Sequence, residues 1–157
     1  MDDPDAGAVA RLADDVGAWD VNLEIRPGPD VEPIVTTGVA TNRLVGGRWL
    51  VVDISTASGF EGHGVYGWNP TIGSYVGSWV DSMGPSIAEA VGSWDPDSRT
   101  MSYEVAVAYQ GQTIVYREVT RRPDADTREY QNLMPAPDGT EFPAITATYR
   151  RRPAAAP

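Results

Sequence analysis

Alternation of apolar and polar residues is the main pattern of this chain. Trp19, Val21 and Leu23, for example, alternate with polar neighbours, which is the period of a strand with one buried face. Similar short segments recur about every eight to twelve residues, separated by turns rich in Gly, Pro, Asn and Asp. Residues 85–91 fit either a brief helix or an irregular crossing. The expected strands are residues 19–25, 35–43, 48–55, 62–68, 74–83, 101–109, 113–121, 128–134 and 144–151.

Residues 5–16 form the best helix candidate. Four apolar residues in this segment have the i, i+3, i+4, i+7 spacing of one helical face: Val9, Leu12, Ala13 and Val16. Pro4 or Asp5 could begin the helix. Because it is short, we expect it to pack as a lid or plug on a larger body.

Eight or nine strands with turns between them and no second long helix predict an all-β protein. The expected fold is a single antiparallel β-barrel of about 8–10 strands with a short N-terminal helix, and a sandwich is the alternative. A closed barrel is favoured because it removes the exposed edge strands. We expect one domain over residues 1–157, with a core of about 12–151 and frayed ends at 1–4 and 153–157.

Residues 62–83 are expected to form a hairpin at the centre of the fold. Its second strand places four residues on one face, which we expect to line the interior: Tyr75, Gly77, Trp79 and Asp81. A five-residue loop at 69–73 would pair His63 with Trp79 and bring the imidazole inside, diagonal to Asp81. A four-residue loop would send His63 to the opposite face, since a slip of one residue exchanges the faces. We prefer the five-residue loop.

A second hairpin is expected over residues 101–121. Its first strand has a clear apolar face, which consists of Met101, Tyr103, Val105, Val107 and Tyr109. A two-residue turn at Gly111-Gln112 would place Glu118 inside. A three-residue loop would place Arg117 inside instead, and the sequence leaves both open.

Composition and charge exclude several kinds of site. The net charge of −10 argues against a nucleic-acid-binding surface. With no cysteine and one histidine, disulfides, thiolate nucleophiles and zinc sites with several histidines are excluded, and we expect no metal and no cofactor. The acidic N-terminus lacks the features of a secretory signal, and no apolar run approaches the ~20 residues of a membrane helix. We therefore expect a soluble cytoplasmic protein without nucleic-acid or membrane partners.

Several short segments carry a family resemblance. They are Leu-Val-Gly-Gly-Arg-Trp-Leu-Val at 44–51, Gly-Phe-Glu-Gly-His-Gly at 59–64, Tyr-Val-Gly-Ser-Trp-Val-Asp-Ser-Met at 75–83, Gly-Ser-Trp-Asp at 92–95, Pro-Asp-Gly-Thr-Glu-Phe at 137–142 and Tyr-Arg-Arg at 149–151. Together they resemble the bacterial domain-of-unknown-function family fifteen seventy-nine over about residues 12–151. The chain departs from the family at Trp68, where tyrosine is usual. The resemblance implies a lipocalin-like barrel and little about activity.

Three residues are candidates for acid–base chemistry: Asp81, His63 and Glu118. A carboxylate inside an apolar barrel has a raised pKa that suits proton transfer or the binding of a polar ligand group. The structural alternatives are that Asp81 caps a turn, that His63 is an exposed ring and that Glu118 pairs with neighbouring arginines at the surface. The candidate ligand-binding residues are Tyr75, Trp79, Met83, Tyr103, Val105, Tyr109 and Tyr116, unless the core is filled.

These features favour a barrel that binds a small hydrophobic organic molecule. The leading hypothesis is a cofactor-free cyclase or isomerase of bacterial secondary metabolism, by analogy with small barrels that catalyse such reactions. It would hold its substrate in a reactive shape, and a carboxylate would supply a proton. The alternative is a non-catalytic carrier or sensor, and a third hypothesis is a structural or oligomerising barrel. The sequence leaves a homodimer open.

Overall fold

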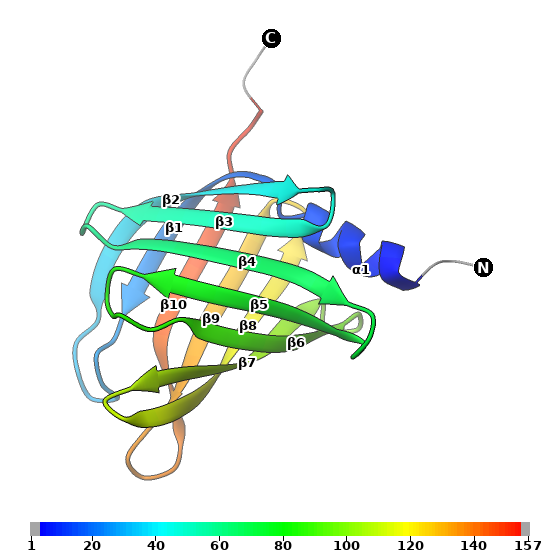
Figure 1. Cartoon of the computed structure of the whole chain (residues 1–157). Coiled ribbons are helices and arrows are strands. Elements are labelled where there is room, and N and C mark those ends of the chain that lie inside the picture. The colour runs from blue at the N-terminus through cyan, green and yellow to red at the C-terminus, as the bar shows by residue number, and fades with distance from the viewer. Residues whose placement is uncertain (1–3, 155–157) are drawn as a thin grey trace.

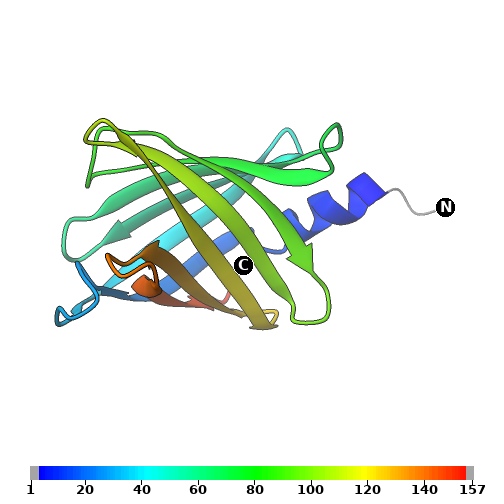
Figure 2. The same cartoon turned by 90° about the horizontal axis from the view of Figure 1, so that it is seen from below.

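Ten antiparallel strands close into a barrel with one helix at its end, as the computed structural model of residues 4–154 shows (Figures 1 and 2). Each strand pairs with the next in sequence, and β1 pairs with β10 to close the barrel. The elements are α1 (Pro4–Ala13), β1 (Gly17–Ile25), β2 (Ile34–Val45), β3 (Trp49–Thr56), β4 (Glu61–Asn69), β5 (Ser74–Asp81), β6 (Ala88–Asp95), β7 (Thr100–Tyr109), β8 (Gln112–Asp124), β9 (Thr127–Pro135) and β10 (Glu141–Arg151). The predicted antiparallel barrel with a short N-terminal helix is confirmed.

Residues 85–91, for which the sequence suggests a brief helix or an irregular crossing, contain the first half of strand β6. Its inward positions include Ala88 and Ala90, which are buried, while Glu89 and Val91, each next to a buried alanine, are exposed. Alanine is not a strong strand former, and an exposed valine obscures the alternation of apolar and polar residues. The sequence pattern therefore gives only a weak strand signal for β6, although β6 pairs with β5 on one side and with β7 on the other.

The β4–β5 hairpin has a four-residue loop, so the preferred five-residue loop is wrong. Asn69 pairs with Ser74, and the Asn69 Oδ1 atom accepts a hydrogen bond from the Thr71 amide at 3.0 Å. In this register Gly64 lies opposite Trp79, and His63 lies opposite Val80. The slip of one residue sends His63 to the outer face of the barrel.

The β7–β8 hairpin turns at Gln110-Gly111, one residue earlier than predicted. Both turn residues have positive φ, 48° and 76°, as a two-residue turn of type I′ requires. Tyr103 pairs with Glu118. The turn still has two residues, so the inward face is the predicted one and includes Glu118, whereas the three-residue loop is wrong.

Helix α1 packs against β3 and β4 at one end of the barrel (Figure 1). Ala8 and Leu12 are buried in a cluster with Leu50, Tyr75 and Met101. The helix ends at Ala13, three residues before the predicted end, and is neither long nor apolar enough to cross a membrane; the same holds for any helix within residues 4–154.

Glycines in β4 and β5 make room for large rings inside the barrel. A Cβ on Gly62 would lie 2.2 Å from the Trp79 ring, and one on Gly77 would lie 2.3 Å from the Tyr66 ring. Side chains at these positions would displace both rings, so glycine is required for the close approach.

Candidate functional site

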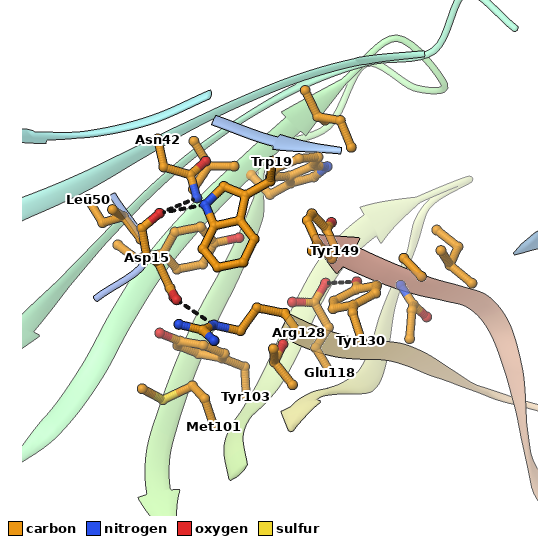
Figure 3. Close-up of a pocket in the computed structure, with 18 of the residues that line it drawn as sticks. Asp15, Trp19, Asn42, Leu50, Met101, Tyr103, Glu118, Arg128, Tyr130 and Tyr149 are labelled. Atoms are coloured by element: carbon orange, nitrogen blue, oxygen red, sulfur yellow. Dashed lines mark hydrogen bonds and ion pairs between the residues drawn. The ribbon is translucent and has the colours of Figure 1, made fainter. Parts of the chain in front are cut away.

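The barrel encloses a cavity of about 210 Å³. Residues from every strand except β6 line it, together with Leu12 of α1, Asp15 and Phe60 (Figure 3). A dry apolar cavity of about 150 Å³ is large enough for benzene. The interior can therefore accommodate a molecule somewhat larger than one aromatic ring.

Glu118 on β8 is a carboxyl group inside this cavity. The Tyr130 hydroxyl donates a hydrogen bond to Glu118 Oε1 at 3.0 Å. Burial raises the pKa of Glu118 to about 7, and the hydrogen bond from Tyr130 opposes that rise only in part. At neutral pH the carboxyl group is therefore divided between its protonated and ionised forms.

Five tyrosines from five strands surround the space near Glu118. They are Tyr66 on β4, Tyr103 on β7, Tyr116 on β8, Tyr130 on β9 and Tyr149 on β10. Burial raises the pKa of each phenol, and the negative charge of Glu118 raises it further. The hydroxyl groups therefore stay neutral across the physiological range of pH and can donate or accept hydrogen bonds.

A buried ion cluster forms the end of the cavity next to α1. Asp15 accepts a hydrogen bond from Arg128 Nε at 2.7 Å (Figure 3). It accepts another from Arg122 Nη2 at 3.0 Å. The Asp15 carbonyl accepts two more, from Trp19 Nε1 at 3.0 Å and from Asn42 Nδ2 at 2.9 Å. These contacts hold the segment after α1 across the barrel end.

The two arginines also stabilise the C-terminal end of α1. Arg122 Nη1 donates to the Arg11 carbonyl at 3.0 Å, and Arg128 Nη2 donates to the Asp14 carbonyl at 3.3 Å. The last carbonyls of a helix have no partners within it and carry partial negative charge. Cations at this position therefore fix the helix to the barrel.

Three buried polar atoms on the cavity-lining residues lack a hydrogen-bond partner within residues 4–154. They are Asn42 Oδ1, Arg122 Nε and Asn132 Oδ1. Asn132 lies directly opposite Glu118 in the β8–β9 pair. Buried polar atoms are ordinarily paired, so these three atoms mark places where the cavity wall lacks a polar partner.

Asp81 faces the cavity from the end of β5, as the predicted alternation requires. Its Oδ2 accepts a hydrogen bond from Trp79 Nε1 at 2.8 Å, and its Oδ1 accepts one from the Met83 amide at 2.9 Å. Asp81 therefore anchors the indole and caps the turn after β5, which leaves Glu118 as the carboxyl group with more freedom to act.

His63 does not line the cavity, which corrects its predicted inward position. It lies on the outer wall, where its Nδ1 atom is 2.6 Å from Asp53 Oδ1 and its side chain is 47% exposed. The register of the β4–β5 hairpin causes this placement. His63 cannot act on a molecule inside the barrel.

The predicted ligand-binding residues divide into two groups. Trp79, Tyr103 and Tyr116 line the cavity. Tyr75 is buried, but its hydroxyl donates to the Ala8 carbonyl of α1 at 3.2 Å, and Val105 packs in a separate apolar cluster. Met83, two residues after β5, is 75% exposed, and Tyr109, the last residue of β7, is 52% exposed. None of these four residues lines the cavity.

Sequence reasoning missed much of the site. Besides Asp15 and the two arginines, it did not single out Tyr66, Tyr130 and Tyr149. Alternation along β9 and β10 offered a signal for the last two, because Tyr130 is two residues from Asn132 and Tyr149 two from Ala147, and all of these face inward. Glu118 does not pair with its arginine neighbours, since Arg117 binds Glu141 and Arg121 binds Glu129.

Comparison with known proteins identifies a family. No curated protein matches the chain significantly in sequence. A model of the family described as "Protein of unknown function (DUF1579)" matches residues 8–151. The chain belongs to this family. The family match spans all ten strands of the barrel and the second half of α1.

The crystal structure of Rv2717c from M. tuberculosis is similar to this DUF1579 barrel. The two superpose with a TM-score of 0.72 over 93% of this chain and 98% of that chain. Their sequences are 17% identical. At this identity the similarity shows a shared fold, and the function must be argued from the site.

Proposed function

We propose that this barrel binds a small, mainly apolar organic molecule in its interior and serves as its carrier or sensor. The observation that supports the proposal is the cavity of about 210 Å³ lined by aromatic and aliphatic side chains, with Glu118 among them. A concave, mainly apolar pocket with a few polar groups is typical of small-molecule sites.

The lining provides both affinity and orientation. Leu23, Ile54 and Ile145 supply aliphatic surface, and burial of a ligand contributes about 0.8 kcal/mol for each methylene group. Glu118 and the tyrosine hydroxyls supply hydrogen bonds at defined positions. The combination favours a ligand with an apolar body and one or two polar groups.

Isothermal titration calorimetry with 2-phenylethanol and indole tests the proposal. We expect saturable binding with one site per chain. Ala147 lies in the cavity wall, so Ala147→Leu should fill part of the space and weaken binding. Thr146→Leu, one residue away on the outer face of β10, is the matched control and should bind normally. Absence of saturable binding in the wild-type protein would refute the proposal.

A second candidate function, cofactor-free isomerisation or cyclisation, is favoured by Glu118. A carboxyl group with a pKa of about 7 can take a proton from one atom of a ligand and return it to another. Neutral tyrosine hydroxyls can hold a ligand carbonyl while its α-proton moves. The cavity would hold a flexible molecule in one conformation, which lowers the entropic part of the barrier.

The fate of the ligand distinguishes the two functions. Native mass spectrometry followed by release should return an unaltered molecule from a carrier and a rearranged one from an enzyme. For an enzyme, Glu118→Gln should abolish conversion and retain binding. We further propose that the ligand is a metabolite of bacterial secondary metabolism and that the protein acts in the cytoplasm. Biosynthetic genes beside the gene for this protein would support the proposed origin of the ligand.

A further inference from the structure

We propose that the ligand is a small organic amine, bound as its ammonium form by Glu118 and the surrounding tyrosines. This inference rests on the proposed binding function and adds the chemical class of the ligand. It follows from the distribution of charge, of unpaired acceptors and of aromatic rings inside the barrel.

Of the charged groups that line the cavity, Glu118 has the fewest partners. Arg122 and Arg128 both bind Asp15, and the Asp14 carboxylate lies 3.8 Å from Arg122. Asp81 accepts two hydrogen bonds, one from an indole and one from an amide. Within residues 4–154 no cation forms an ion pair with Glu118, and its one hydrogen bond comes from the neutral Tyr130.

Two acceptor atoms on a facing pair of residues, Glu118 and Asn132, have no hydrogen-bond partner among the described residues. The Glu118 Oε2 atom has no hydrogen-bond partner among the described residues, in contrast to Oε1. Asn132 is 8% exposed, and its unpaired Oδ1 atom belongs to the residue directly opposite Glu118. An ammonium group has three donors and no acceptor, so it complements this arrangement.

The tyrosine rings favour a cation in the same space. Tyr66 and Tyr103 lie with their ring centroids 5.5 Å apart and their planes at 53°, and Tyr116, Tyr130 and Tyr149 come from the neighbouring strands. The face of an aromatic ring attracts a cation within about 6 Å of its centroid, most strongly away from water. A carboxylate among such rings offsets the cost of removing an ammonium group from water.

The size of the cavity limits the rest of the ligand. At about 210 Å³, it suits an amine attached to one aromatic ring by a short chain. Arg122 Nε, at the α1 end, is the unpaired donor that would instead favour an anion. The test therefore compares cationic, neutral and anionic molecules of similar shape.

The experiment is isothermal titration calorimetry at pH 8 with 2-phenylethylamine, 2-phenylethanol and phenylacetate. We expect the amine to bind on the order of tenfold more tightly than the alcohol, and phenylacetate to bind most weakly. Glu118→Gln should reduce the affinity for the amine to that for the alcohol. Glu89→Gln, on the exposed face of β6, is the control and should keep the preference.

The preference should also depend on pH. From pH 5 to pH 8 the amine stays protonated, as lysine does, while Glu118 ionises. The affinity of the protein for 2-phenylethylamine should therefore rise about tenfold. The five tyrosines that face Glu118 stay neutral because burial raises the pKa of each phenol; Asp15 and Asp81 are the other carboxylates that line the cavity. Affinity for 2-phenylethanol should stay constant.

Three results would overturn the inference. If the alcohol or phenylacetate binds as tightly as the amine, the ligand class is wrong and the proposed binding function stands. If the amine binds equally well to Glu118→Gln, the carboxylate is not its partner. If none of the three molecules binds, the proposed function fails as well.

Discussion

Tyr130 donates a hydrogen bond to Glu118 across 3.0 Å inside the barrel (Figure 3). Tyr130 pairs directly with Thr120 in the β8–β9 ladder, so Tyr130 and Glu118 are diagonal neighbours on the inner face. Burial of Glu118 disfavours its charge, and this hydrogen bond is the contact that favours it. The ionisation of Glu118 therefore links the stability of the barrel to its binding chemistry.

Glu118→Gln should stabilise the protein at high pH. The folded-state pKa of about 7 lies above the ordinary glutamate value of 4.5, so between these pH values the folded wild-type protein holds a proton that the unfolded chain releases. The contribution of the Glu118 carboxyl group to the free energy of unfolding is fully present below pH 4.5 and is lost as the pH rises through 7. Relative to the variant, the wild-type protein loses on the order of 3 kcal/mol over this range. Urea unfolding at pH 4.5 and pH 8 measures it, with Glu89→Gln as the control. A pH-independent difference would contradict the prediction.

Tyr130→Phe should raise the pKa of Glu118 further. The phenol donates to the carboxylate, and a hydrogen bond to a charged group contributes about 1.5 kcal/mol or more, which corresponds to a rise of about one unit. The side-chain carbon chemical shift of Glu118, followed by NMR over pH, measures the change. Tyr109→Phe, at an exposed position, should leave it unaffected, and an unchanged or lower pKa in Tyr130→Phe would be incompatible with this account.

Asp15→Asn should destabilise the barrel. It removes the carboxylate that binds Arg122 and Arg128, whose side chains are each 6% exposed. Leaving a buried charge without its partner is costly, and because Asp15 is partly accessible we expect a loss of about 2–3 kcal/mol. Chemical unfolding measures the effect. Asp20→Asn, in an exposed pair with Arg152, should change stability by less than about 0.5 kcal/mol; equal effects would contradict the assignment.

Gly77→Ala should disturb the cavity wall. The new methyl group would lie 2.3 Å from the Tyr66 ring, so the ring must move, at a cost of about 1–3 kcal/mol. Gly84→Ala, where a Cβ would meet no atom within 4 Å, is the matched control. Thermal unfolding and titration with 2-phenylethanol measure both variants. Normal stability and binding in Gly77→Ala would show that Tyr66 does not need this space.

The architecture and two inner faces could be predicted from sequence because alternation is a local property. The pattern of Tyr75, Gly77, Trp79 and Asp81 fixes one face of β5 without knowledge of its partners. The apolar face of β7 was visible in the same way, but the sequence left open whether Glu118 or Arg117 of β8 faces inward, because a two-residue turn gives the first and a three-residue loop the second. Strand β6 was missed because its inward residues are small and Val91 is exposed.

The remaining features depend on single-residue register and on long-range contacts. The length of the β4–β5 loop, four or five residues, decides whether His63 faces in or out. The composition of the turn does not distinguish these two lengths. The ion cluster joins Asp15 to Arg122 and Arg128, which are more than 100 positions away. Nothing local in the sequence marks these arginines as buried, because arginine is ordinarily exposed.

The most direct test of the central claim is an NMR titration of the Glu118 side-chain carboxyl group in the ligand-free wild-type protein. A carboxyl group enclosed in the barrel among tyrosines should titrate with a midpoint near pH 7. A midpoint near the ordinary glutamate value of 4.5 would show that Glu118 is in contact with water, and it would contradict the interior site from which the proposed binding and the proposed ligand class are argued.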